Sequence, residues 1–242
     1  MATVPAPSPP AQKQTVYLSL DIEKGGNTFD HPLLAVGVCV ADFTKGVSKK
    51  RTWCCLQRPG QSFELRCIYE FWCKYPEVLR RIDVEGKPLE EQMKSFSEFL
   101  HQLDAQFPSE QYNVVLISDN PSFDIEHLDH YFCEITKEVP IRYSRANKYR
   151  SVEDPSERLE ALDMWKEEGE LLKSVPFVNH DHYPENDAEK IFWQHVLAMA
   201  AGNLLKKDGM TLAKVKEQLA GLKTNEPEKL ADKLLALARG AT

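Results

Sequence analysis

Four acidic residues stand where the sequence predicts that strands end and helices begin. Asp21 and Glu23 lie two positions apart in an alternating segment, so both carboxylates project from the same face of a strand. Asp124 opens an expected helix after a short apolar strand, and Asp187 opens another after a loop that contains histidines. Carboxylates brought together repel one another unless a cation is bound, and their hard oxygens suit Mg²⁺ or Mn²⁺. Two such ions about 3.5–4 Å apart can activate a water molecule and stabilise the leaving oxygen of a displacement at phosphorus.

Hydrophobic periodicity predicts the elements that must position these acids. Residues 15–23 alternate, with Val16, Leu18 and Leu20 on the face opposite the two acids. Runs rich in apolar and β-branched residues predict further strands at 33–43, 50–57 and 113–117. Apolar residues at helical spacing, with Ser122 as the N-cap of the third segment, predict helices at 64–75, 89–107, 123–135, 156–172, 187–205, 212–222 and 227–239. This order predicts an α/β fold whose mixed β-sheet is flanked by helices.

Length and composition set the domain organisation that we expect. The chain has 242 residues, of which 42% are hydrophobic, and a formal net charge of −7. This composition indicates a globular protein, and any nucleic-acid-binding surface must concentrate its cations locally. No apolar run approaches the roughly 18–20 residues that a membrane span requires. We predict a disordered, proline-rich tail at 1–14, a domain at 15–205 and a C-terminal helical extension at 206–242.

The cysteines and the first residues indicate the compartment. None of the six cysteines forms a CxxC pair, and Cys54 and Cys55 are adjacent, which suits neither a zinc site nor an ordinary disulfide framework. The first ten residues include four prolines and no basic residue before an apolar stretch, so they do not resemble a signal peptide. We therefore expect reduced thiols in an intracellular protein, cytoplasmic or nuclear, that is not secreted and has no membrane partner.

Three short motifs in this sequence resemble those of the DEDD, or DnaQ-like, 3′–5′ exonucleases, whose fold is ribonuclease H-like. Asp21-Ile22-Glu23 is similar to the first motif, DxE. The segment from Asn120 to Asp124 is similar to the second, N-x-x-F-D, and the segment from His182 to Asp187 is similar to the third in its histidine form, H-x4-D. The motifs follow the family's order and separations, and the resemblance covers roughly residues 16–205. The histidine form indicates the DEDDh subgroup.

The resemblance implies a metal-dependent 3′–5′ exonuclease that releases nucleoside 5′-monophosphates from the end of a DNA or RNA strand. In that family arrangement Asp21 bridges two Mg²⁺ or Mn²⁺ ions, Glu23 and Asp187 share one of them, and Asp124 holds the other mainly through water. A histidine takes the proton from the attacking water. The expected partner is therefore a nucleic acid, single-stranded or with an accessible 3′ end.

Two neighbouring residues compete for the role of general base. His182 stands five residues before Asp187 and matches the histidine form of the motif, whereas Tyr183 stands four before it and satisfies the tyrosine form, Y-x3-D. His180 fits neither spacing. A histidine titrates near neutral pH, and a tyrosine, with a pKa near 10, is a poor base there. We therefore predict His182 as the catalytic base, with Tyr183 as the alternative.

Substrate contacts are predicted in three places. The resemblance puts backbone contacts to the terminal nucleotide directly after Glu23, at Lys24, Gly25, Gly26 and Asn27, and includes Asn120 of the second motif among the substrate-binding residues. Phe29 is a candidate to wedge against the last base. Cations interleaved with tyrosines are typical of a single-strand contact surface, and they occur at Arg142, Arg145, Lys148 and Arg150. A second basic cluster consists of Lys45, Lys49, Lys50 and Arg51.

Two other functions compete with a nuclease. A catalytically silent relative would bind nucleic acid or a partner protein, but it predicts a missing ligand, and all four acids are present. Alternatively, the protein could be an interaction protein whose leucine-rich C-terminal helices bind a partner instead of packing on the core. Among the remaining histidines and acids, we expect His195 to be a core residue, and we expect His127, Asp129 and His130 to lie on a helix surface.

Overall fold

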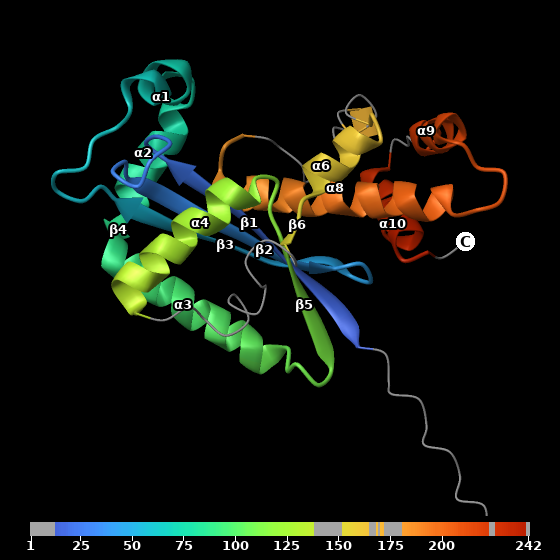
Figure 1. Ribbon diagram of the computed structural model, residues 1–242, viewed down its shortest axis with the longest axis horizontal. Coiled ribbons are helices and arrows are strands. Elements are labelled where there is room, and N and C mark those ends of the chain that lie inside the picture. The colour runs from blue at the N-terminus through green and yellow to red at the C-terminus, as the bar shows by residue number, and fades with distance from the viewer. Residues whose placement is uncertain are drawn as a thin grey trace, which may run out of the picture.

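The computed structural model describes residues 13–137, 152–164, 168, 170–171, 181–222 and 226–240. Within that part, every predicted strand is present, and α helices and short 3-10 and π turns cover the sheet (Figure 1). The helices described in those ranges include none that is long and apolar enough to cross a membrane.

A mixed sheet forms the centre of the molecule. Its six strands lie in the order β4-β3-β2-β1-β5-β6, where β1 pairs antiparallel with β2 and parallel with β5. β2 and β3 are antiparallel, whereas β3–β4 and β5–β6 are parallel. The strands are β1 (Gln14–Lys24), β2 (Leu33–Asp42), β3 (Gly46–Leu56), β4 (Lys87–Pro88), β5 (Tyr112–Ile117) and β6 (Val152–Glu153). The mixed α/β architecture that the element order predicts is confirmed.

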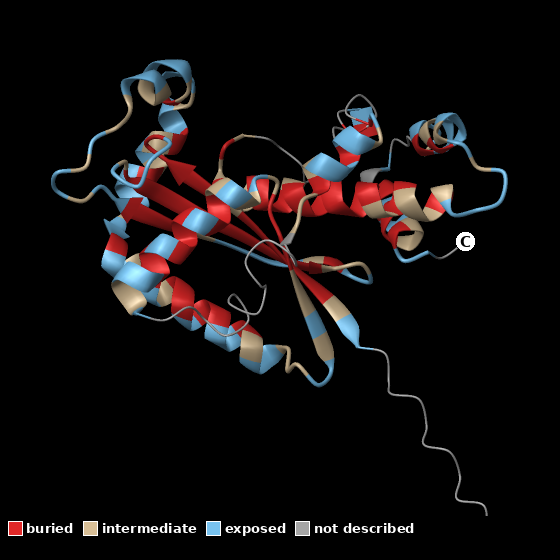
Figure 2. Ribbon diagram, viewed as in Figure 1, coloured by how far each residue is buried: buried red, intermediate tan, exposed pale blue. Residues whose placement is uncertain are grey.

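Helices cover both faces of the sheet, which buries its central strands on both sides (Figures 1 and 2). On one face, α3 (Leu89–Gln106) and α4 (Pro121–Tyr131) pack on the even-numbered side chains of β1, Val16 to Ile22. On the other face, α8 (Pro184–Leu205) crosses β1, β2 and β3 and forms a second core with Tyr17. The alternation in β1 therefore separates two cores, as its period of two requires.

The segment predicted as one helix at 64–75 is broken, and a helix follows that the sequence analysis missed. α1 (Leu65–Glu70) ends at Phe71, a 3-10 turn η1 spans Trp72–Lys74, and α2 spans Pro76–Glu85. Leu65 and Tyr69 are 69% and 70% exposed, so the expected apolar face does not form. Of the expected apolar face, Leu65, Ile68, Tyr69 and Trp72, only Trp72 is buried. It packs on Leu34, Val78 and Ile82, and its indole N–H donates to the carbonyl of Lys24 at 3.0 Å.

Other helix boundaries also differ from the expectation. α4 begins after Asn120, with Pro121 in its first turn, so Ser122 lies inside the helix and is not its N-cap. A π-helical turn, η2, follows at Phe132–Thr136. α8 begins at Pro184, three residues before the expected start, for the same reason. α6 (Pro155–Ala161) confirms the start of the helix predicted at 156–172, most of whose second half lies outside the described residues.

The two C-terminal helices pack their apolar side chains against the core of the domain. α9 (Leu212–Ala220) and α10 (Pro227–Ala238) contribute to the α8 core through Val215, Leu219, Leu230 and Leu234. Asn203 of α8 donates to the carbonyls at the end of α10, and Arg239 donates to the carbonyl of Phe43 at 2.6 Å. The apolar faces of these helices are thus used within the chain.

Candidate active site

The ends of two neighbouring parallel strands bring the first acids together. Asp21 and Glu23 lie near the end of β1, on the face that α8 covers. β5 runs parallel beside β1 and leads into α4, whose first turn carries Asp124. Asp187 lies in the first turn of α8. All four predicted acids therefore converge at the carboxyl-terminal edge of β1 and β5.

Glu23, His182 and Asp187 form the tightest group. One potential ligand atom from each lies within 4.8 Å of the others, which no other set of three or more His, Cys, Asp or Glu residues matches in the part of the chain that the structure describes. All three side chains are buried, at 7%, 8% and 5% exposure. The Nδ1 atom of His182 lies 3.6 Å from Oδ2 of Asp187, close enough for an ion pair when the imidazole is protonated.

Asp21 and Asp124 lie outside that group but are close enough to interact electrostatically with it. Burial raises the pKa of Asp21 well above its usual range, and the charges of Glu23, Asp124 and Asp187 raise it further. Burial likewise raises the pKa of Glu23, with Asp187 and Asp124 adding to the effect. Oδ2 of Asp21 is buried and has no hydrogen-bond partner among the described residues. An orphaned buried carboxylate oxygen amid other acids fits a hard divalent cation.

Asp124 is held by neighbours that the sequence analysis did not single out. The Ser118 hydroxyl donates to Oδ2 of Asp124, and the Asn120 amide donates back to the Ser118 oxygen at 3.1 Å. Burial raises the pKa of Asp124 well above its usual range; the Ser118 hydrogen bond opposes this, and the charges of Asp119 and Asp154 add to it. Their position between the apolar strand and the second motif is the sequence feature that could have identified Ser118 and Asp119 as neighbours of Asp124.

The two candidate bases have different polar neighbours. His182 has a left-handed backbone, with φ of 59°, and its ring packs on Phe71 and Tyr75 at centroid distances of 4.7 and 4.0 Å. Tyr183 packs on the apolar cluster that also includes Phe71 and Tyr75, and the guanidinium of Arg81 lies 5.1 Å from its ring centroid. His182 is thus the one that faces the acids, and His180 lies outside the described residues.

The loop after Glu23 is tied to the α1 region. The Gly25 amide donates to the Pro32 carbonyl and its own carbonyl accepts from the Glu64 amide, each at 2.8 Å, so both of its backbone groups are already bonded. A Cβ on Gly26 would lie 2.4 Å from the His31 ring, so this position requires glycine. The Asn27 amide donates to the Glu64 carboxylate at 3.3 Å. A role of this loop in nucleotide contact stays a prediction.

Lys24 is buried beside Glu23, at 5% exposure, and its ammonium lies 5.8 Å from the ring centroid of the exposed Phe29. The Lys24 ammonium donates to the Thr28 carbonyl at 3.1 Å and lies 5.1 Å from the Phe123 ring centroid. Burial lowers the pKa of Lys24 to about 8. Phe29 is 43% exposed and lies with its ring centroid 4.5 Å from that of His130 and from that of His127.

Some predicted surface and substrate residues have other environments. His127 and Asp129 are buried at 5% and 7% exposure, contrary to the expected helix surface, whereas His130 is exposed as predicted. For His127 the reason is the loop after β1, whose Phe29 ring packs on the imidazole with 4.5 Å between ring centroids. Asn120 is the exposed N-cap of α4 and accepts from Ser122 at 3.2 Å. The basic residues Arg142, Arg145, Lys148 and Arg150 lie outside the described residues.

The second basic cluster lies on β3 and the turn before it. Lys50 forms an ion pair with the buried Glu189 of α8 at 2.6 Å, and the Arg51 guanidinium lies 4.7 Å from the Trp53 ring. These two cations therefore have partners within the fold. His195 is buried at 2% exposure, as predicted, and burial lowers its pKa to about 3.

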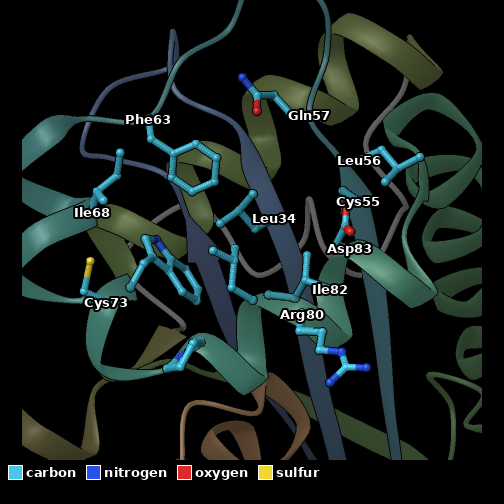
Figure 3. A pocket seen from close by; sticks show the side chains of 13 residues that line it. Leu34, Cys55, Leu56, Gln57, Phe63, Ile68, Cys73, Arg80, Ile82 and Asp83 are labelled. Atoms are coloured by element: carbon cyan, nitrogen blue, oxygen red, sulfur yellow. The ribbon is translucent and has the colours of Figure 1, made fainter.

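An apolar pocket of about 640 Å³ lies between β3 and the α1–α2 segment. Figure 3 shows Phe63, Leu34 and Ile82 gathered in it. Trp72 also lines this pocket, and its indole N–H holds the Lys24 carbonyl. None of the four acids lines the pocket, so it is separate from the carboxylate site.

The acids gathered at the ends of the parallel strands β1 and β5 form a site that is suited to cation-assisted hydrolysis. A model of the 3′-5′ exoribonuclease Rv2179c-like domain family matches residues 16–199. The chain belongs to this family, which confirms the predicted exonuclease class and nucleic acid as the substrate class. No protein among curated sequences matches the chain. The matched region runs from β1 into α8 and therefore contains all four acids and His182.

Proposed function

We propose that this protein is a metal-dependent 3′–5′ exoribonuclease of the DEDDh type with a ribonuclease H-like fold. One observation carries the proposal. Four acids and one histidine, from three segments that are far apart in the sequence, converge at one edge of the sheet. The family match supports the direction and the RNA substrate, and the order of the three motifs supports the DEDDh type.

The four carboxylates of Asp21, Glu23, Asp124 and Asp187 would hold two Mg²⁺ or Mn²⁺ ions. Bound ions of this kind lower the pKa of a water and offset charge on the phosphoryl oxygens. Burial raises the pKa of Asp21, Glu23 and Asp124, and the charges of the other cluster acids raise those of Asp21 and Glu23 further, which means that the ionised cluster is unfavourable without added positive charge. The Ser118 hydroxyl donates to Oδ2 of Asp124, which orients this carboxylate in the site.

His182 accepts the proton from the attacking water in this proposal. The water oxygen bonds to the terminal phosphorus, the bond from phosphorus to the 3′ oxygen of the preceding nucleotide breaks, and that oxygen takes up a proton. A nucleoside 5′-monophosphate leaves, and the strand is one residue shorter. The Asp187 carboxylate, 3.6 Å from Nδ1, stabilises the imidazolium that forms.

The 3′ end of the strand would lie beside Glu23. Asn27 is exposed in the loop after Glu23, Asn120 is the N-cap of α4, and the exposed Phe29 ring offers a surface for base stacking, whereas Lys24 and Gly26 are buried in that loop. The basic segment with Arg142, Arg145, Lys148 and Arg150 would bind phosphates farther along the strand.

The test uses the full chain on matched 5′-labelled RNA and DNA single strands. We expect a ladder of products shortened from the 3′ end of RNA, loss of activity with a chelator, and recovery with Mg²⁺ or Mn²⁺. Asp21→Asn should abolish hydrolysis, whereas Asp232→Asn, an exposed acid on α10, should not. Equal or faster cutting of DNA would reassign the substrate, and an active Asp21→Asn variant would overturn the metal site.

A further inference from the structure

The segment that carries His182 and Asp187 is anchored from outside the carboxylate cluster. Arg81 of α2 donates from Nη1 to Oε1 of Glu185, in the first turn of α8, at 2.6 Å. The same guanidinium lies 5.1 Å from the Tyr183 ring centroid. Arg81 therefore contacts the two side chains that flank Pro184, between the proposed base and the proposed metal ligand.

Glu185 is tied to the sheet as well. Its Oε2 accepts from the hydroxyl of Thr52 on β3. Burial alone would raise the pKa of Glu185, but hydrogen bonds from Thr52 and Arg81 outweigh it, so the pKa is lowered. Thr52 pairs with Gly37 across β2 and β3, and Gly37 pairs with Asp21 across β1 and β2. The Glu185 carboxylate thus connects α2 and β3 to the start of α8. Its partner Thr52 lies in the same cross-strand row as Gly37 and Asp21.

The Glu85 carboxylate orients the guanidinium of Arg81. Its Nε lies 3.1 Å from both carboxylate oxygens of Glu85, one turn later on α2. The side chains of Arg81 and Glu185 are only 28% and 19% exposed. By contrast, Arg66 and Glu70 form a pair within α1 at 71% and 65% exposure. A partly buried pair that joins distant segments restrains geometry, whereas an exposed pair within one helix contributes little.

We propose that Arg81 is a positioning residue for the nuclease reaction: through Glu185 and Tyr183 it holds the first turn of α8 so that His182 and Asp187 meet Glu23. This inference rests on the proposed function. The Arg81 guanidinium contacts Glu85, Glu185 and Tyr183, so it acts on His182 and Asp187 through these neighbours. The amides of Asn186 and Asp187 both donate to the Tyr183 carbonyl, at 2.8 and 3.0 Å, and report whether this turn stays closed.

The experiment compares Arg81→Met, Arg81→Lys and Glu185→Gln with the matched control Arg66→Met, in the full chain. Single-turnover rates, KM for a labelled RNA strand and the rate against pH are measured well below each melting temperature. Because a displacement of about 1 Å can cost about 100-fold in rate, Arg81→Met should lower kcat by roughly 10- to 100-fold. KM should change by less than about threefold, Arg81→Lys should recover part of the rate, and Arg66→Met should match the wild type.

Two further measurements separate positioning from general stability. The double variant of Arg81→Met with Glu185→Gln should be no slower than the worse single variant, since both remove the same contact. Hydrogen exchange at the amides of Asn186 and Asp187, measured without substrate, should speed up in Arg81→Met and not in Arg66→Met. Additive losses, or wild-type kcat for Arg81→Met, would overturn the inference.

The outcome for the proposed function is read separately. If the wild type does not shorten RNA, or if Asp21→Asn is active, the proposed function fails, while the hydrogen-exchange result still decides whether Arg81 holds the turn. If both nuclease controls behave as expected and exchange at the two amides is unchanged by Arg81→Met, the positioning role of Arg81 is wrong and the nuclease stands.

Discussion

Gly37→Ala should damage the active site without touching any of its acids. Gly37 lies in β2 between Asp21 and Thr52, and α8 begins directly over it. An added Cβ would lie 2.1 Å from the backbone carbon and oxygen of Pro184, whereas ordinary contacts begin at 3.4 Å. The start of α8 must therefore move away from the sheet by about 1 Å, and a displacement of that size can cost about 100-fold in rate.

The same substitution should also destabilise the fold, so a matched control variant is needed. Overpacking a buried contact destabilises by about 1–3 kcal/mol. In a chain of this size each kcal/mol lowers the melting temperature by about 2–4 °C, so the melting temperature of Gly37→Ala should fall by about 2–12 °C, and activity is measured below it. Gly202→Ala is the matched variant, because Gly202 also lies in the α8 region but has no atom within 4 Å of its added Cβ. It should keep full activity and gain about 0.5–1 kcal/mol of stability.

The assay is kcat/KM on a labelled RNA strand, together with the melting temperature in chelator. We expect Gly37→Ala to lose roughly 100-fold in kcat/KM while most of the loss falls on kcat, because the base and one ligand move together. Activity within threefold of the wild type would refute the argument that close approach of α8 to β2 sets the site geometry.

Three further predictions address the base, the acids and the substrate path. His182→Ala should slow hydrolysis by about 10²–10⁴-fold with metal binding retained, and Tyr183→Phe should cost little; the reverse result would move the enzyme to the tyrosine branch. In chelator, the melting temperature should fall as pH rises above about 4, because the unfolded acids ionise first. A melting temperature that rises over that range would contradict the raised pKa values of Asp21, Glu23 and Asp124. Removing one phosphate-contacting cation should reduce the slope of log affinity against log salt by about 0.7, and an unchanged slope after replacing all four would exclude a role for Arg142, Arg145, Lys148 and Arg150.

Local pattern was sufficient for much of this protein. The alternation of residues 15–23 predicts a strand with Asp21 and Glu23 on one face, and β1 confirms it because the period of a strand is two. A buried strand followed by a proline-containing turn predicts that Asp124 opens a helix, as α4 does. Each of these relations joins residues only a few positions apart, which is why sequence alone could predict them.

Only the tertiary structure decided which distant residues meet and which way their side chains turn. His182 and Tyr183 are consecutive, yet a left-handed backbone at His182 turns one ring toward Glu23 and Asp187 and leaves the other beneath Arg81. The unpredicted α2 supplies that arginine. These relations depend on the close approach of α8 to β2 and on the contacts of Arg81 with Tyr183 and Glu185, and no local propensity encodes the distance between segments that approach each other only in the folded chain.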